Sequence, residues 1–191
     1  MKNQDYLYLD HAASTPMRRS ALEKYVEAES FGFANSSGGH KLSRDSKNLL
    51  EDSREKIAGL FNAAPGEIIF TSGGTEADNW TIKSLFESKK PDDNLVTSNI
   101  EHEAVLASAE WVSINGYQTK YAKSDENGFV SKDEFLNQID DNTKVASLMW
   151  GNNETGVIQP VKDVSKEKLY EWKKELTSKS DNFFSSIGSF P

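Results

Sequence analysis

Cysteine is absent from the sequence, which has 191 residues. Without it the polypeptide has no disulfides, no thiolate metal ligands and no cysteine nucleophile of its own. Long apolar runs are also missing, because none approaches the roughly 18 to 20 residues that span a bilayer. Residues 1–5 are polar and lack the apolar core of a signal peptide. We therefore expect no membrane association and a cytoplasmic location.

Positive charge is in short supply as well. The chain has 22 Lys and Arg against 30 Asp and Glu, a net charge of −8, and no long Lys/Arg block. This balance argues against nucleic acid as a partner. Hydrophobic residues make up 36% of the chain and aromatic residues 10%, which is too apolar for intrinsic disorder. A chain of this length has room for one domain, or for one and part of a second, with a core.

Short apolar runs alternate with helical patterns along most of the chain. Runs typical of strands occupy residues 6–9, 67–71, 94–98, 118–122 and 144–150. Helical patterns begin at Pro16 behind an N-cap at Thr15, directly after Gly74, and within residues 42–61, 104–112 and 132–139. Ser131 and Glu134 form a capping box for the last of these. The alternation indicates βαβ units and a mostly parallel sheet with flanking helices, which is an α/β fold class.

A Gly-Gly turn stands between a predicted strand and a helix in residues 70–79, Phe-Thr-Ser-Gly-Gly-Thr-Glu-Ala-Asp-Asn. Two glycines let the backbone approach a bulky anion, Ser72 and Thr75 add hydroxyl donors, and the first N–H groups of a helix carry partial positive charge. The turn matches neither GxGxxG nor GxxxxGK[ST], so it lacks the residues of a Rossmann or P-loop site. From spacing alone, both a phosphate site and a tight turn with an N-cap stay open.

His102 follows the predicted strand at 94–98, and ligands of open α/β sheets bind at the carboxyl ends of strands. A histidine there could stack on a planar ligand, act as a base or bind a metal ion. The alternative is a surface histidine between two solvated carboxylates, Glu101 and Glu103. The three histidines of the chain show neither HxH nor HExxH spacing, so we expect no metal site.

Two further loops are rich in amides, glycine and serine. Asn152 and Asn153 follow the predicted strand at 144–150, where their amides either hydrogen-bond a ligand oxygen or satisfy loop backbone. Residues 33–40, Phe-Ala-Asn-Ser-Ser-Gly-Gly-His, form a weaker candidate, because such loops are often flexible connectors.

Five segments, in this order, resemble the N-terminal half of the pyridoxal-phosphate-dependent cysteine desulfurases, within the class V aminotransferase group. Each is similar to a motif of that family: 8–16 to YLDHAATTP, 33–40 to FGNPSSxH, 71–79 to TSGGTEADN, 100–106 to IEHxAVL and 152–160 to NNETGVIQP. The resemblance implies that residues 1–161 are the N-terminal part of a fold-type-I large domain. Residues 162–191 would then be a divergent charged helix and tail.

The resemblance also implies a cofactor, pyridoxal 5'-phosphate, and the residues that bind it. Gly74 and Thr75 would bind its phosphate, which agrees with the anion-binding turn described above. His102 would stack on the pyridine ring, and Asn153 would lie near the phenolic oxygen of the ring and the substrate. Asn35 would contact the substrate.

Other parts of the family's machinery have no counterpart in this sequence. In the family an aspartate in HxDAxQ, a Schiff-base lysine in SxHK, a persulfide-forming cysteine and a carboxylate-binding arginine all follow the NNETG segment. Residues 37–41, Ser-Gly-Gly-His-Lys, resemble SxHK only superficially, since they precede the phosphate turn. The loop at 33–40 departs from the family at Ala34 and Ser36, where glycine and proline are usual. We therefore assign no catalytic residue and expect a truncated form that is inactive by itself.

The function implied is that of a cysteine desulfurase, which converts L-cysteine to L-alanine and transfers the sulfur through a persulfide. The product serves iron–sulfur cluster or thio-cofactor biosynthesis, so the implied partners are L-cysteine and a sulfur-acceptor protein. Family members are homodimers, but much of that surface has no counterpart here. Two alternatives remain, a non-catalytic remnant that acts as a binding or interaction module, and another class V aminotransferase or lyase.

Overall fold

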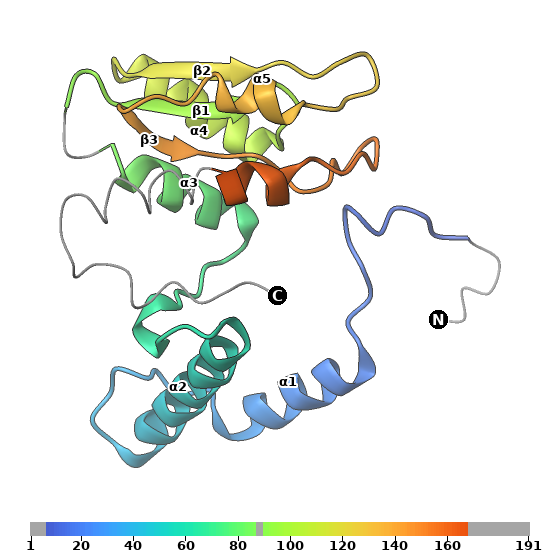
Figure 1. The fold of residues 1–191 in the computed structure, drawn as a ribbon. Coiled ribbons are helices and arrows are strands. Elements are labelled where there is room, and N and C mark those ends of the chain that lie inside the picture. Colours follow the sequence, from blue (N-terminus) through green and yellow to red (C-terminus); the bar gives the residue numbers. More distant parts are fainter. Residues whose placement is uncertain (1–6, 87–89, 168–191) are drawn as a thin grey trace. The chain divides into compact units, whose positions relative to one another are not determined.

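The structure of the protein is a computed structural model that describes residues 7–86 and 90–167 (Figure 1). Two compact units divide the chain after Ile69. The described part of the first unit is residues 7–69, and that of the second is residues 70–86 and 90–167. Among the described residues, no helix has the length and apolar character needed to cross a membrane.

The first unit is helical, with α1 at Arg19–Phe31, α2 at Lys41–Phe61 and a 3-10 turn, η1, at Pro65–Glu67. The helices contact each other near Gly32, where an added Cβ would lie 2.8 Å from the Ala28 carbonyl oxygen and 2.9 Å from Leu49 Cδ2. Only glycine therefore fits at this point. The predicted start of α1 at Pro16 is wrong, because residues 15–18 are irregular and Arg18 is the N-cap.

The long helix at 42–61 is confirmed as α2. The side chain of His40 caps its start by accepting a hydrogen bond from the Ser43 backbone N–H at 3.3 Å. Asn62 ends it in the left-handed region, at φ 52°. The three buried residues of α2 are small, however, and they are Ser43, Ser46 and Ala58. Its leucines do not form a buried stripe within this unit, since Leu60 is 82% exposed.

Two of the five predicted strands do not form. Residues 7–9 of the first are irregular, with Leu7 84% exposed, and Tyr6 lies outside the described residues. The second gives way to η1 at its start, and Ile69 is 58% exposed. A short apolar run becomes a strand only where a neighbouring strand completes its hydrogen bonds, and in the described chain neither run has such a neighbour.

The second unit is built on a three-stranded parallel sheet. Its strands are β1 at Asn94–Ser98, β2 at Gln118–Ala122 and β3 at Thr143–Ala146, in the order β2-β1-β3. The bounds of β1 and β2 agree with the sequence prediction. The prediction for the third strand extended too far, because β3 ends at Ala146. Ser147 N–H still donates to the Val96 carbonyl, but Met149 N–H donates to the Glu101 side chain instead. The α/β fold class is confirmed as a small parallel sheet with flanking helices.

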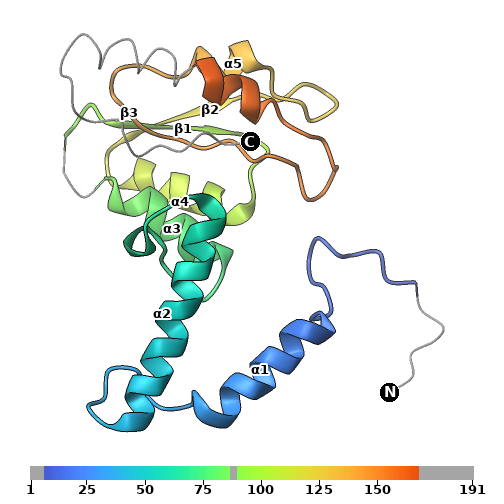
Figure 2. The same ribbon diagram turned by 60° about the horizontal axis from the view of Figure 1, so that its bottom comes forward.

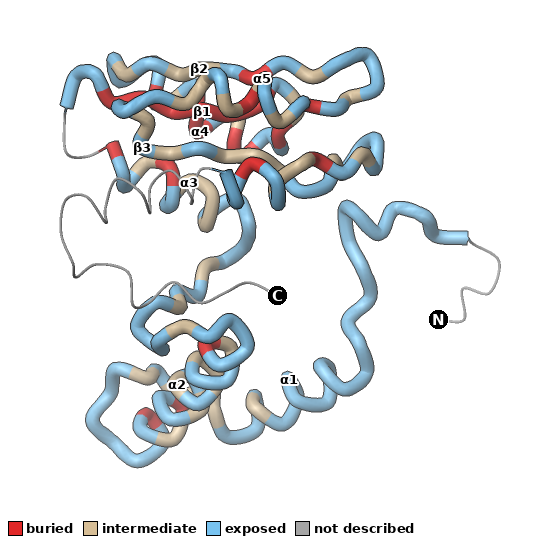
Figure 3. The backbone as a smooth tube through the Cα atoms, in the orientation of Figure 1, coloured by how far each residue is buried: buried red, intermediate tan, exposed pale blue. Residues whose placement is uncertain are grey.

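Helices cover both faces of this sheet. Because neighbouring residues of a strand point to opposite faces, adjacent residues of β1 contact different helices. Leu95 packs against α3, Gly74–Ser84, and α4, Glu103–Ile114, in a cluster with Phe86 and Val112. Val96 faces the other side, toward α5, Lys132–Leu136, and the helical residues 161–167. Figure 2 shows the two helical layers above and below the strands. All of β1 is buried, as the continuous red segment in Figure 3 shows.

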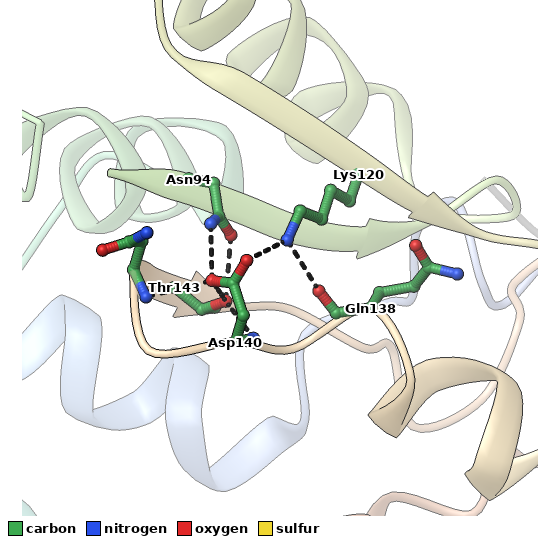
Figure 4. A network of polar contacts seen from close by, with 6 residues as sticks. Asn94, Lys120, Gln138, Asp140 and Thr143 are labelled. Carbon is green, nitrogen blue, oxygen red and sulfur yellow. Dashed lines mark hydrogen bonds and ion pairs between the residues drawn. The ribbon is translucent and has the colours of Figure 1, made fainter. Parts of the chain in front are cut away.

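Polar side chains tie the strands together where β1 and β3 begin (Figure 4). Asp140 accepts hydrogen bonds from Lys120 Nζ at 2.5 Å and from Asn94 Nδ2 at 2.8 Å. The Thr143 hydroxyl donates to Asn94 Oδ1 at 2.9 Å, and Lys120 also donates to the Gln138 carbonyl at 3.2 Å. The hydrogen bonds from Lys120 and then Asn94 hold the pKa of Asp140 well below its usual range. The polar side chains at the amino ends of these strands are therefore used in hydrogen bonds within the protein. A ligand site is expected at the carboxyl ends instead.

Candidate cofactor site

The carboxyl ends of β1 and β3 form a topological switch point of the sheet, because the connections after these two strands go to opposite faces. The chain leaves β1 toward α4 on one face, and it continues from β3 toward the helical residues 161–167 on the other. In open α/β sheets a crevice forms between two such strands, and ligands bind there. The loops at this point are residues 99–102 and 147–157, and they contain the predicted residues His102 and Asn153.

His102 is the N-cap of α4. Its Nδ1 accepts a hydrogen bond of 3.1 Å from the backbone N–H of Ala104, which satisfies one of the free donors at the helix start. The remainder of the imidazole is exposed at the edge of the sheet. The side chain therefore has a local structural task and still offers a ring face to a planar ligand.

Glu101, beside it, is not the solvated carboxylate that the sequence suggested. It is 8% exposed, and its Oε1 accepts hydrogen bonds from the Met149 backbone N–H at 2.7 Å and from the Ser98 hydroxyl at 3.4 Å. Burial raises the pKa of this carboxyl, and the charge of Asp78 adds to the rise, while the Met149 and Ser98 hydrogen bonds oppose it. The sequence offered one sign that Glu101 is held by hydrogen bonds, namely Ser98, a possible donor three residues earlier at the end of the strand. The partner, 48 residues away, was not visible in the sequence.

The two adjacent asparagines of the second loop have different tasks. Asn152 is used by the protein, since its Nδ2 donates to the Ile100 carbonyl at 2.9 Å and its Oδ1 accepts from the backbone N–H groups of Glu154 and Thr155, each at 2.9 Å. Asn153 is exposed, and its Nδ2 donates to Glu154 Oε1 at 3.0 Å. Within the described residues its Oδ1 has no hydrogen bond, so this atom can accept one from a ligand.

The Gly-Gly turn forms the start of α3, as predicted. Gly73 is the N-cap and Gly74 the first helical residue, and an added Cβ at either would meet nothing within 4 Å. The Glu76 carboxylate accepts hydrogen bonds from Ser72 N–H at 2.6 Å and from its hydroxyl at 2.7 Å, which lower the pKa of Glu76. In the described part of the chain the Thr75 hydroxyl makes no hydrogen bond. The turn thus has open space, free N–H donors and an unused hydroxyl.

α3 and α4 run side by side in the same direction. At one end the charge of Asp78 acts on Glu101, and at the other the Tyr117 hydroxyl donates to the Phe86 carbonyl at 2.7 Å. The start of α3 therefore lies at the same edge of the sheet as the start of α4. The second unit carries the turn at Gly74 and Thr75, the ring of His102 and the amide of Asn153 along this one edge.

Asn35 belongs to the first unit. Its side chain is exposed and accepts a hydrogen bond of 3.0 Å from the Ser37 backbone N–H, and its carbonyl accepts from Gly38 N–H at 3.1 Å. Both bonds hold the 33–40 loop in a turn. Asn35 is therefore not part of the arrangement described for the second unit, and its contact with a substrate remains a prediction.

The residues at the sheet edge fit a flat, phosphorylated ligand. An anion is favoured at a helix start with free N–H groups, and a heteroaromatic ring is favoured against an exposed imidazole. The open space around Gly73 and Gly74 leaves room for a phosphate close to the backbone. Pyridoxal 5'-phosphate combines these two groups, with a phenolic oxygen that suits a nearby amide.

The fold is thus that of an α/β protein with a candidate ligand site at the carboxyl end of a parallel sheet. The model of the aminotransferase class-V family matches residues 7–170, and the chain belongs to this family. It is 39% identical over 159 residues to the protein named cysteine desulfurase IscS of Methanosarcina thermophila, a match that covers 83% of this chain and 39% of that protein.

Two solved structures share the fold. A NifS-like protein aligns with a TM-score of 0.79 and 34% identity over 84% of this chain and 44% of its own. SspA in complex with cysteine aligns with a TM-score of 0.78 and 33% identity over 86% of this chain and 48% of its own. The chain therefore spans less than half the length of these relatives.

Proposed function

We propose that the chain binds pyridoxal 5'-phosphate and contributes to a cysteine desulfurase reaction. In that reaction L-cysteine and an acceptor thiol yield L-alanine and a persulfide, which supplies iron–sulfur cluster or thio-cofactor assembly. The observation that carries the proposal is that the helix starts at Gly74 and His102 and the loop with Asn153 all belong to the carboxyl end of the sheet in the second unit. Relatives named cysteine desulfurase, and a related structure that contains cysteine, support the substrate.

Each residue at this edge has a defined task in the proposal. The N–H groups at the start of α3 and the Thr75 hydroxyl bind the phosphate. His102, held by its bond to the Ala104 N–H, would stack on the pyridine ring. Asn153, whose Nδ2 is bonded to Glu154, would accept a hydrogen bond from the ligand at its free Oδ1. When bound, pyridoxal phosphate supplies an electron sink for bonds at the α-carbon of the amino acid.

We also propose that these 191 residues do not turn over cysteine by themselves. Transfer of sulfur as a persulfide needs a thiol, and the sequence contains no cysteine. The thiol would then come from outside these 191 residues. The lysine that binds the cofactor covalently in the family lies in a segment that has no match here.

Reductive trapping tests this proposal. The purified chain is incubated with pyridoxal phosphate, reduced with borohydride, and analysed by intact mass and peptide mapping. We expect saturable binding before reduction and no adduct concentrated at one lysine. Cysteine with a reductant should yield no sulfide or alanine above a blank without protein. A single labelled lysine, or turnover by the chain alone, would contradict the claim of inactivity.

A second candidate function, a non-catalytic interaction module, is favoured by α1. No residue of this helix is buried, and Leu22, Tyr25 and Val26 are exposed at positions that share one helix face. Size-exclusion chromatography with light scattering separates the two candidates when it is combined with the binding assay. Self-association or partner binding without any affinity for pyridoxal phosphate would favour the module.

A further inference from the structure

Glu101 links two loops that lie far apart in the sequence. The first loop, residues 99–102, joins β1 to α4 and contains His102, and the second, residues 147–157, follows β3 and contains Asn153. The bond from Met149 N–H to Glu101 Oε1, at 2.7 Å, crosses between them. We call this contact the Glu101–Met149 bridge. Its length is at the short end of the range for N–H···O hydrogen bonds.

The bridge is buried, whereas the two ligand-facing side chains are exposed. Glu101 is 8% exposed, and it is held from its own strand by the Ser98 hydroxyl. Burying a carboxylate costs free energy unless hydrogen bonds satisfy it, and Glu101 has two such bonds. Replacing Glu101 by a residue without an acceptor would leave the Met149 N–H unpaired. The bond from Asn152 Nδ2 to the Ile100 carbonyl, at 2.9 Å, joins the same two loops a second time.

The charged group that faces Glu101 from the neighbouring helix is Asp78 of α3. Within the described chain Asp78 makes no hydrogen bond to Glu101, and its charge acts on Glu101 only through space. Met149 N–H and the Ser98 hydroxyl are therefore the donors that hold Glu101 in position. Glu101 itself does not lie on the exposed surface that a ligand would contact.

We propose that Glu101 is a positioning residue that sets the spacing between His102 and Asn153, and with it the two sides of the cofactor site. This inference rests on the proposed binding of pyridoxal phosphate. A carboxylate of this length reaches Met149 from the β1 side, and the loops that it joins each carry one ligand-facing side chain. The sheet fixes this spacing only as far as Ser147, whose N–H donates to the Val96 carbonyl at 2.9 Å, and Asn153 lies six residues further along the chain.

Three variants of the full chain test the bridge. Glu101→Gln keeps the length of the side chain and a carbonyl oxygen that accepts from Met149. Glu101→Asp keeps the charge but shortens the reach by about 1.5 Å, one carbon–carbon bond. Glu101→Ala removes the acceptor. The matched control is Glu134→Ala, since Glu134 Oε1 also accepts a backbone N–H at this edge, from Lys123 at 3.1 Å, but joins other loops.

The first readout is hydrogen–deuterium exchange of peptides that cover Met149, without any cofactor. We expect exchange at least about tenfold faster in Glu101→Asp and Glu101→Ala, and within about threefold of the parent in Glu101→Gln. The second readout is the dissociation constant of pyridoxal phosphate from absorbance titration. It should rise about fivefold or more in the Asp and Ala variants and recover in the Gln variant. The Glu134→Ala control should match the parent in both.

Rescue by Gln but not by Asp is the signature of positioning through a hydrogen bond of defined reach. Unchanged exchange in the Asp and Ala variants would overturn the proposal. Loss of the cooperative unfolding transition in all three variants would also overturn it, because Glu101 would then support the fold as a whole. If the parent chain does not bind pyridoxal phosphate, the proposed function fails, while the exchange pattern still decides whether the bridge holds the loops.

Discussion

Asn94 Nδ2 donates a hydrogen bond of 2.8 Å to Asp140 Oδ1, across 46 residues of sequence. Asn94 is the first residue of the central strand and is 1% exposed, so both ends of its amide need partners. Thr143 supplies the second one. At this point the register between β1 and β3 shifts, because Asn94 pairs with Thr143 and Leu95 with Val145. The side-chain bonds hold the start of β3 in place where the backbone ladder is irregular.

Asp140→Asn should destabilise the second unit in a pH-dependent way. The carboxyl has its pKa held below its usual range by Lys120 and Asn94, so its contribution is fully present above its unfolded pKa of about 3.9 and is lost as the pH falls further. Because Asp140 is partly exposed, we expect a loss of about 1 kcal/mol at pH 7. Urea unfolding at pH 7 and pH 3 should show a smaller difference between variant and parent at pH 3.

Asp141→Asn is the matched control for this measurement. Asp141 is exposed and makes no hydrogen bond or ion pair with any described residue, so the same change of charge should leave the unfolding free energy nearly unaltered at both pH values. An equal loss in Asp140→Asn at pH 3 and pH 7 would show that the charge of Asp140 is not what stabilises the sheet.

Thr75→Val should weaken the binding of pyridoxal phosphate without affecting the fold. The two side chains have nearly the same shape, and the Thr75 hydroxyl makes no hydrogen bond to another described residue. The loss of one hydrogen bond to a phosphate should raise the dissociation constant by about tenfold. Isothermal titration checks the affinity, and thermal unfolding followed by circular dichroism should move little.

Thr81→Val provides the comparison on the same helix. Thr81 is exposed within α3 and its hydroxyl likewise makes no hydrogen bond to a described residue, but it lies two turns beyond the helix start. Its replacement should leave the affinity unchanged. If the two variants bind pyridoxal phosphate equally well, the phosphate does not contact Thr75.

Two substitutions at His102 should separate its structural task from its role toward a ligand. His102→Asn keeps an N-cap side chain for α4 and removes the ring, so stability should change by less than about 0.5 kcal/mol while the affinity for pyridoxal phosphate falls. His102→Phe keeps an aromatic face and loses the cap, which should cost about 1 kcal/mol and preserve more of the affinity. Parallel melting and absorbance titrations check both variants. A loss of affinity that simply follows stability would argue against ring stacking.

Leu95→Ala should cost about 2 to 5 kcal/mol of unfolding free energy, the range found for buried leucines. Leu95 is 0% exposed and packs with Phe86 and Val112 between the sheet and its helices. Leu60→Ala is the control, because Leu60 is 82% exposed and should cost under about 0.5 kcal/mol. Chemical denaturation of both variants measures the difference. Similar losses would show that Leu95 does not stabilise the unit through burial.

Local sequence signals predicted the elements of the second unit well. β1 and β2 have the predicted bounds, and each is a short run of residues that pairs with the other in parallel register. The Ser131 hydroxyl caps α5 by accepting from Glu134 N–H at 3.1 Å, as expected. The second half of that capping box is absent, because Glu134 Oε1 accepts from Lys123 N–H instead. The Glu134 carboxylate thus accepts from the distant Lys123 N–H and not from the nearby Ser131 N–H.

The same signals were wrong where a strand needs a partner. Residues 67–71 are as apolar as a buried strand, but in the described chain no strand pairs with them. The predicted strand at 144–150 is shortened for a different reason. Its last residues leave the ladder, and Met149 N–H is bonded to Glu101. Of the charged helix and tail predicted over residues 162–191, the structure describes a helix at residues 161–167, and residues 168–191 lie outside the described residues.

The sequence by itself determined the family, the Gly-Gly turn at a helix start, and the placing of His102 and Asn153 after strands, because these features depend on residues that are close in the chain. Only the tertiary structure decided which carboxylate is buried and which asparagine is available. Glu101 and Glu103 look alike in sequence, as do Asn152 and Asn153. Glu101 and Asn152 are set apart by bonds to Met149 and Ile100, and such partners meet only when strands and helices have packed.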